Sequence, residues 1–104
     1  MEQYKSNAAD ILFEILQERK KQDAKFGIQN HSPIEWIAIL GEEFGEASKE
    51  ALEAHFKQKN NFGSLGKSEE NLQNLRNELI QVAAVAAAFV ECLDRNVWHQ
   101  DNEE

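Results

Sequence analysis

The acidic residue Glu78 lies in the middle of an apolar helical stripe, and this placement constrains the fold of the chain. At about 100° per residue, Glu78 shares one helix face with large apolar side chains, and Gln81 borders that face. The apolar residues of this stripe are Leu75, Val82, Val85, Phe89 and Leu93. Burying an unpaired carboxylate is costly, so such a group normally protonates, pairs with a base or binds a metal.

A second acidic group precedes the first in the chain. Glu43, Glu46 and Glu50 share one edge of a predicted helix, beside a stripe formed by Ile37, Leu40, Phe44, Ala47 and Ala51. Two helices therefore point acidic side chains towards a core. Oxygen donors spaced by three residues on facing helices suit a hard divalent cation. In the alternative interpretation, Glu78 is a polar residue at a helix–helix seam and pairs with Arg76, Arg95 or a basic residue of another chain.

The charge of the chain limits its partners. The 104 residues carry a formal net charge of −8, which argues against nucleic acid or an anionic membrane as a partner. The longest apolar run, residues 82–90, is far shorter than the roughly 20 residues needed to span a bilayer. The lone Cys92 cannot form an intramolecular disulfide, and the first residues lack the apolar core of a signal peptide. We therefore expect a cytoplasmic protein.

The pattern predicts an all-α single domain over residues 1–104, with three main helices. The first helix is expected over residues 6–24 with Ser6 as N-cap, and the second over residues 32–56, where Ser32, Pro33 and Glu35 form a strong start signal. Residues 57–67 read as a loop, and the third helix is expected over residues 68–96 with Ser68 as N-cap. Residues 98–104 are expected to be a frayed tail. Stripes this broad predict a helical bundle completed by dimerisation, or a tetramer.

These residues resemble the MazG-like all-α nucleoside triphosphate pyrophosphohydrolases. The family signature combines Glu-x-x-Glu on one helix with Glu-x-x-Asp on a later helix. Here Glu43-Phe-Gly-Glu46 matches the first half, and Glu78-Leu-Ile-Gln81 matches the second half except at its last position. The segments at residues 18–27 and 29–36 also look like one branch of the family, so the resemblance covers roughly residues 14–95.

The chain departs from the family pattern in two ways. Gln81 stands where the pattern has Asp, which replaces a charged ligand with a neutral amide that holds Mg²⁺ less tightly. Residues 47–77 separate the two halves, a long spacing for this family. The extra length falls in the predicted loop, where an insertion costs little because loop-closure entropy grows only logarithmically.

The resemblance implies cleavage of a ribo- or deoxyribonucleoside triphosphate to the monophosphate and pyrophosphate, as nucleotide-pool housekeeping. Mg²⁺, or alternatively Mn²⁺, would be held by Glu43, Glu46 and Glu78 with Gln81, and would lower the pKa of an attacking water. Glu42 or Glu50 would take the proton of this water, although Glu42 points away from the stripe and also reads as a solvated residue.

Further substrate contacts are expected mainly from the resemblance. Lys25, Lys49 and Arg76 are candidates for neutralising the phosphates, although exposed lysines are commonly only solvated. Phe26, Asn30, His31 and Trp36 surround the start of the second helix and are candidates for contacting the nucleoside. Their alternative roles are a core residue for Trp36 and a loop residue for His31. Cys92 is expected to be a buried packing residue.

Two other functions remain open at this point. The first is a catalytically weak or inactive dimer of the same fold that acts as a nucleotide-binding or regulatory module, with Gln81 marking a decayed metal site. The second is a helical assembly protein whose acidic residues pair across an interface.

Overall fold

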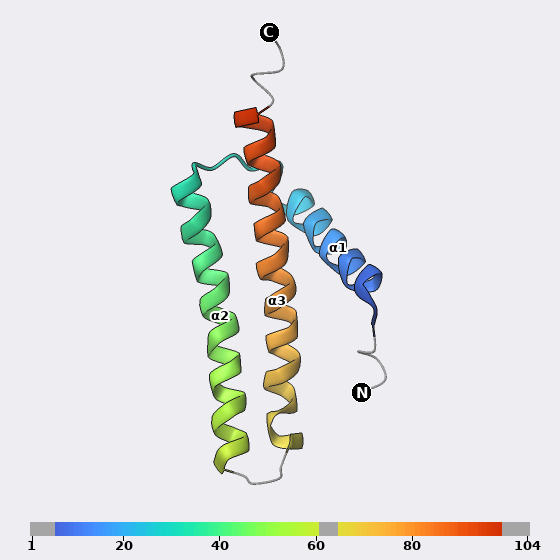
Figure 1. Ribbon diagram of the computed structural model, residues 1–104, viewed down its shortest axis with the longest axis vertical. Helices are drawn as coiled ribbons and strands as arrows, with labels where there is room; N and C mark the ends of the chain where they lie inside the picture. Colours follow the sequence, from blue (N-terminus) through green and yellow to red (C-terminus); the bar gives the residue numbers. More distant parts are fainter. Residues whose placement is uncertain (1–5, 61–64, 99–104) are drawn as a thin grey trace.

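The computed structural model describes residues 6–60 and 65–98 and contains three long helices (Figure 1). These are α1 (Ala8–Phe26), α2 (Pro33–Asn60) and α3 (Leu65–Leu93), and a π-helical turn, η2 (Asp94–Trp98), continues α3. Within these residues there is no β-strand. The predicted all-α class with three main helices is confirmed.

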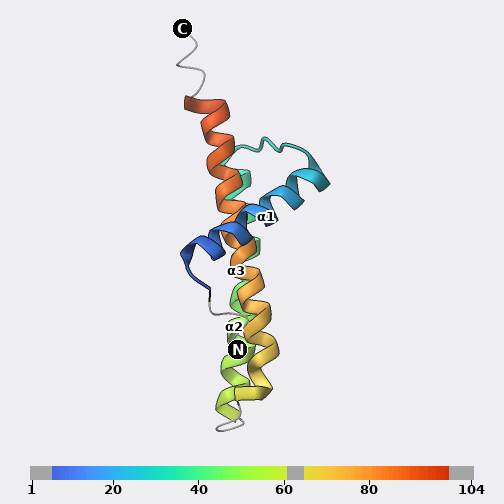
Figure 2. The same ribbon diagram turned by 90° about the vertical axis from the view of Figure 1, so that its right-hand side faces the viewer.

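The helices α2 and α3 form a long antiparallel hairpin, and α1 crosses α3 on the side away from α2 (Figure 1). A second view shows the same crossing, with α1 lying obliquely over the middle of α3 (Figure 2). In the described part of the chain, α1 packs on α3 but not on α2. Helix α3 therefore lies between α1 and α2, which carries Glu43, Glu46 and Glu50.

The start of α2 follows the predicted capping box. The backbone N–H of Ser32 donates to Oε1 of Glu35 at 2.8 Å, and the backbone N–H of Glu35 donates to the Ser32 hydroxyl at 3.3 Å. The same arrangement begins α1 one residue later than predicted, because Asn7 and Asp10 form the reciprocal pair and Ser6 is not the cap. The first helix ends at Phe26, not at residue 24, because Gly27 adopts a positive φ of 73° that stops it.

The predicted start of the third helix is wrong. Ser68 is not an N-cap: α3 already begins at Leu65, and the Ser68 side chain is fully buried. The predicted loop over residues 57–67 is correspondingly wrong at both ends, because residues 57–60 belong to α2 and residues 65–67 to α3. Residues 61–64 lie outside the described residues. At the other end α3 stops at Leu93, and Trp98 belongs to η2, whereas the rest of the predicted tail, residues 99–104, is not described.

The core lies between α2 and α3 near the end of α3. Trp36, Val85, Ala88 and Cys92 are buried together, and Phe89 stacks on the Trp36 ring with centroids 5.8 Å apart. Further along the hairpin, the buried residues are small: Ala47 and Ala54 on α2 and Ala84 on α3. Small residues allow the two helices to approach closely. The interpretations of Trp36 and Cys92 as core residues are confirmed.

A large part of the apolar surface remains exposed. Ile37, Phe44, Leu52 and Phe56 on α2 are each more than half exposed. The molecule measures 63 × 28 × 22 Å and has a radius of gyration of 17.2 Å, whereas a compact domain of about 100 residues has a radius of gyration near 13 Å. None of the described helices combines the length and apolar character required to cross a membrane.

Candidate functional site

The acidic site centres on Glu43, which lies half-buried on α2. Burial raises the pKa of the Glu43 carboxyl above its ordinary value, and repulsion from Glu78 and Glu46 raises it further, with smaller contributions from Glu42 and Glu18. Each cause disfavours the charged form of the carboxyl. The structure therefore brings both halves of the predicted motif into one electrostatic environment, although they lie on different helices.

Glu18 also belongs to this environment, although the sequence motif assigns it no role. It lies on α1, half-buried, and its charge reaches Glu43 across α3. It also lines the groove between α1 and α3 together with Gln81. A carboxylate from a third helix thus stands near the position where the family pattern has Asp and this chain has an amide. The one sequence signal for Glu18 was that it begins the segment over residues 18–27, which resembles one branch of the MazG-like family.

These carboxylates do not form a ready-made chelate. Within residues 6–60 and 65–98, no group of three or more His, Cys, Asp or Glu side chains is gathered closely enough to hold a metal ion. The donors nevertheless suit Mg²⁺ chemically, because carboxylate and amide oxygens are its usual protein ligands. Glu43, Glu46, Glu78 and Gln81 therefore stay predicted ligands.

The candidate bases differ in their surroundings. Glu42 is exposed on α2. Glu50 is half-buried two turns beyond Glu43, and its Oε1 accepts a hydrogen bond from Nδ2 of Asn71 at 2.9 Å. Asn71 is buried and also accepts a hydrogen bond from Lys57 at 2.6 Å, so Glu50 belongs to a polar network that joins α2 to α3. Glu42 has the greater access to solvent of the two.

The predicted basic contacts do not gather in one place. Arg76 forms a bidentate pair with Glu14 of α1, in which Nη1 donates to Oε1 at 2.9 Å. Lys49 is exposed on α2. Lys25, also exposed, lies over the ring of Phe26 at 5.1 Å from its centroid and borders the α1–α3 groove.

The α1–α3 groove holds two adjoining cavities of about 530 and 310 Å³. Glu18, Lys21 and Gln81 line both of them. The larger, which we call the large cavity, adds Phe13 and Ile80 as apolar walls, whereas the small cavity adds Gln22, Lys25 and Phe26. Cavities of several hundred cubic ångströms are of the size that accepts small molecules.

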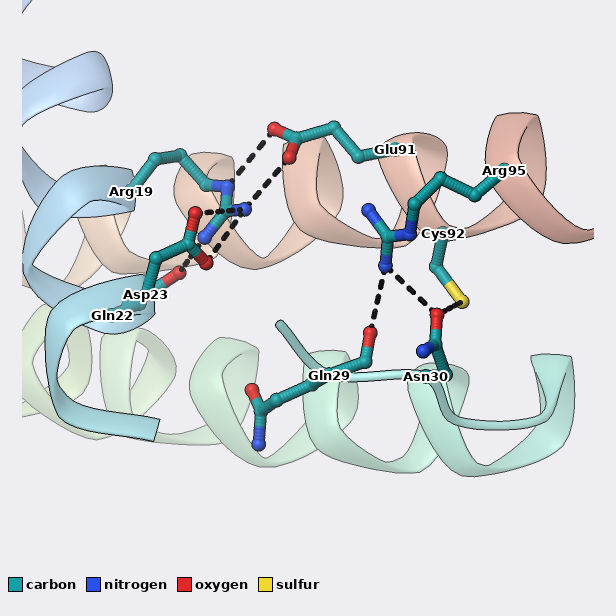
Figure 3. A network of polar contacts seen from close by, with 8 residues as sticks. All are labelled: Arg19, Gln22, Asp23, Gln29, Asn30, Glu91, Cys92 and Arg95. Carbon is teal, nitrogen blue, oxygen red and sulfur yellow. Dashed lines mark hydrogen bonds and ion pairs between the residues drawn. The ribbon is translucent and has the colours of Figure 1, made fainter. Parts of the chain in front are cut away.

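The residues around the start of α2 mostly hold the connection between α1 and α2 against the end of α3. Asn30 Oδ1 accepts hydrogen bonds from Arg95 at 2.9 Å and from Asn96 at 2.8 Å (Figure 3 shows the Arg95 contact). Trp36 is buried and meets His31 edge to face, with centroids 4.9 Å apart. In this arrangement Trp36 and His31 pack on each other. Of the four residues predicted to contact the nucleoside, Phe26 is the one that lines either of the two cavities.

Three buried nitrogens at this junction have no hydrogen-bond partner among the described residues. They are His31 Nε2, Trp36 Nε1 and Arg95 Nε. Unpaired buried donors are costly, and ordered water is their usual partner.

An ion pair positions α1 on α3. Arg19, which is buried on α1, donates from Nε and Nη2 to the two carboxylate oxygens of Glu91 at 3.1 and 2.8 Å (Figure 3). Arg19 also holds Gln22 Oε1 at 3.1 Å and contacts Asp23. No local sequence pattern predicts this pair, because its members lie 72 positions apart in the chain.

Comparison with protein-family models, with curated proteins and with solved structures found no match to this chain. The resemblance to the MazG-like family therefore rests on the motif residues and on the segments over residues 18–27 and 29–36.

Proposed function

We propose that this protein is a Mg²⁺-dependent nucleoside triphosphate pyrophosphohydrolase that releases a nucleoside monophosphate and pyrophosphate. The observation that carries the proposal is the environment of Glu43, whose carboxyl is half-buried and repelled by acidic neighbours on three helices. A fold keeps uncompensated carboxylates together at a cost to its stability, and a bound cation would offset that cost.

Glu43, Glu46 and Glu78 would hold the cation, with Gln81 and Glu18 on the side of α1. When bound, Mg²⁺ (or Mn²⁺) offsets repulsion between the carboxylates and the phosphates and lowers the pKa of a water molecule. Glu42 is our candidate for accepting a proton, because it is exposed beside Glu43, and Glu50 is the alternative. The amide at position 81 predicts weaker metal binding in the absence of nucleotide, which itself brings oxygen ligands.

The proposed active form is a homodimer or homotetramer in the cytoplasm. The exposed apolar residues of α2 and the elongated shape support an oligomer, because a second copy would bury surface that the single chain leaves in water.

A second candidate function is a nucleotide-binding or regulatory module of the same architecture with weak or no catalysis. Two observations favour it: Gln81 replaces a charged ligand, and the described carboxylates do not form a ready-made metal cluster.

Substituting the motif carboxylates tests the proposal. We expect Glu46→Gln and Glu78→Gln each to lower turnover of nucleoside triphosphates by about 100-fold or more, because each removes a charged ligand of the cation that would stabilise the transition state. Helicity and oligomeric state should stay unchanged. Glu70→Gln, an exposed position on α3, is the matched control and should retain activity.

Calorimetric titration of the unsubstituted protein with Mn²⁺ and with nucleotide, together with an assay of hydrolysis, separates the two candidates. Saturable metal binding with nucleotide hydrolysis supports the enzyme, and nucleotide binding without hydrolysis supports the regulatory module. Wild-type turnover in either motif variant would rule out the ligand assignment.

A further inference from the structure

The two cavities of the α1–α3 groove differ in character along the length of α1. The large cavity has Phe13 and Ile80 as apolar walls and the amides of Gln17 and Asn77 beside them. Its charged lining residues are Glu14, which is paired with Arg76, and Glu18 and Lys21, which it shares with the small cavity. The small cavity has two lysines, Lys21 and Lys25, against the single carboxylate of Glu18. The apolar walls at Phe13 thus suit a planar ring at one end of the groove, and the excess of lysine over carboxylate suits an anion at the other end.

The lysines of the small cavity are available to a ligand. Lys21 is exposed and has no ion-pair or hydrogen-bond partner among residues 6–60 and 65–98. In the same range, Lys25 contacts the Phe26 ring and forms no ion pair or hydrogen bond. The amide of Gln22 is oriented by Arg19, which binds its Oε1 at 3.1 Å. This leaves the Nε2 group of Gln22 as a donor at the small cavity.

The groove adjoins the acidic site. Gln81 lines both cavities and lies one turn from Glu78 on α3, and Glu18, which also lines both, is close enough to raise the pKa of the Glu43 carboxyl. A ligand that fills the groove therefore lies against Glu18 and Gln81, which connect the groove to the acidic site.

We propose that the α1–α3 groove binds the nucleotide, with the phosphate chain in the small cavity beside Lys21 and the nucleoside in the large cavity against Phe13. This proposal rests on the proposed function, and it assigns the nucleoside to the groove instead of the start of α2. The core position of Trp36 supports this change, since its ring is already stacked on Phe89.

Substitutions at both ends of the groove test the assignment with two probes: inorganic triphosphate and a non-hydrolysable nucleoside triphosphate, each with Mg²⁺. We expect Lys21→Gln to weaken binding of both probes by about tenfold, because one charge-assisted contact to phosphate is lost. Phe13→Ala should weaken binding of the nucleotide by about fivefold and leave inorganic triphosphate unaffected, because the ring contacts only the nucleoside.

Neighbouring positions on α1 give matched controls. Lys20 and Leu12 are exposed and do not line either cavity, so Lys20→Gln and Leu12→Ala should bind both probes as the unsubstituted protein does. Sedimentation of every variant checks that assembly is unchanged.

Equal weakening by Lys20→Gln and Lys21→Gln would overturn the inference, since it would indicate a general charge effect. An unsubstituted protein that hydrolyses nucleotides while Lys21→Gln and Phe13→Ala behave as their controls would overturn the groove assignment and leave the proposed function standing. An unsubstituted protein that binds neither metal nor nucleotide would overturn both.

Discussion

At the scale of single residues, folding places the Glu43 carboxyl in surroundings that disfavour its negative charge. Its side chain loses water on folding and gains acidic neighbours, and no basic side chain is among the causes of its pKa shift. The ionised form is therefore less stable in the folded chain than in the unfolded chain. Binding of a cation or of a proton at this site would therefore lower the free energy of the folded chain relative to the unfolded chain.

The pKa shift of Glu43 gives a pH-dependent prediction for the metal-free protein. Because folding raises the pKa of this carboxyl above 4.5, its ionisation destabilises the fold at neutral pH, and this cost disappears as pH falls below about 4. We expect Glu43→Gln to unfold about 2–4 °C higher than the unsubstituted protein at pH 7, corresponding to about 0.5 kcal/mol for a partly exposed group. The melting temperatures should converge near pH 4.

Thermal unfolding in the presence of a chelator, at matched protein concentration, is the measurement. Glu42→Gln is the control, because its side chain is exposed on the same turn, and we expect a smaller gain from it. A constant difference between Glu43→Gln and the unsubstituted protein from pH 4 to pH 7 would show that this carboxyl is not the source.

At the scale of helices, α1 depends on two arginine–carboxylate pairs. Arg19 with Glu91 and Arg76 with Glu14 each join α1 to α3, and α1 has no packing on α2 among the described residues. Several apolar side chains of α1, including Leu12 and Leu16, are exposed. The position of α1, and with it the groove, is therefore set largely by polar contacts.

Removing one partner of the more buried pair should loosen α1. We expect Glu91→Gln to weaken docking of α1 by about 1–3 kcal/mol, because the buried Arg19 loses its bidentate acceptor. Hydrogen exchange of the α1 amides should accelerate, while exchange in the α2–α3 hairpin stays unchanged. Asp94→Asn, an exposed acidic position less than one turn further on, is the control. Unchanged protection of α1 in Glu91→Gln would contradict a docking role for the pair.

The same pair gives α1 docking its own pH dependence. Arg19 lowers the pKa of the Glu91 carboxyl below 4.5 through hydrogen bonding, and Arg76 does the same for Glu14. A lowered pKa contributes stability above the unfolded value, and this contribution is lost as pH falls through the folded value. We therefore expect low pH to weaken the docking of α1 on α3, and to remove the charge repulsion at Glu43 by protonating its carboxyl.

Helix ends could be predicted from the sequence where contacts between residues close in the chain determine them. Ser32 and Glu35 lie three residues apart, so their capping box needs no distant partner. Ser68 shows the limit: the residue type favours a cap, but packing of α3 on α2 extends the helix past it and buries its hydroxyl.

The candidate site likewise contains residues that local sequence patterns point to and one residue that they do not place. Helical periodicity placed Glu43, Glu46 and Glu78 beside apolar stripes, and in the structure the charges of Glu46 and Glu78 raise the pKa of the Glu43 carboxyl. Helical periodicity could not place Glu18 beside Glu43, because that placement depends on how α1 crosses α3. That crossing is fixed by pairs whose members are 62 and 72 residues apart.

At the scale of the whole molecule, the exposed apolar stripe of α2 predicts self-association. Ile37, Phe44, Leu52 and Phe56 share one side of α2, and Phe44 is 62% exposed. We expect at least a dimer at micromolar concentration, and we expect Phe44→Gln to raise its dissociation constant by about tenfold or more, because aromatic anchors dominate such interfaces.

Sedimentation equilibrium measures this association. Ile28→Gln is the matched control, because Ile28 is an exposed apolar residue of the α1–α2 connection and lies outside the stripe. A stable, fully folded monomer of 11.9 kDa for the unsubstituted protein would remove the prediction.

The hairpin architecture also sets an order of assembly during folding. The ends of α2 and α3 are separated by residues 61–64, so closing the hairpin costs little chain entropy, whereas each arginine pair of α1 must close a loop of more than 60 residues. We therefore expect the α2–α3 hairpin to form first and α1 to dock last. In that order the acidic face of the hairpin is open to ions before the groove exists, so a cation can arrive before α1 completes the site.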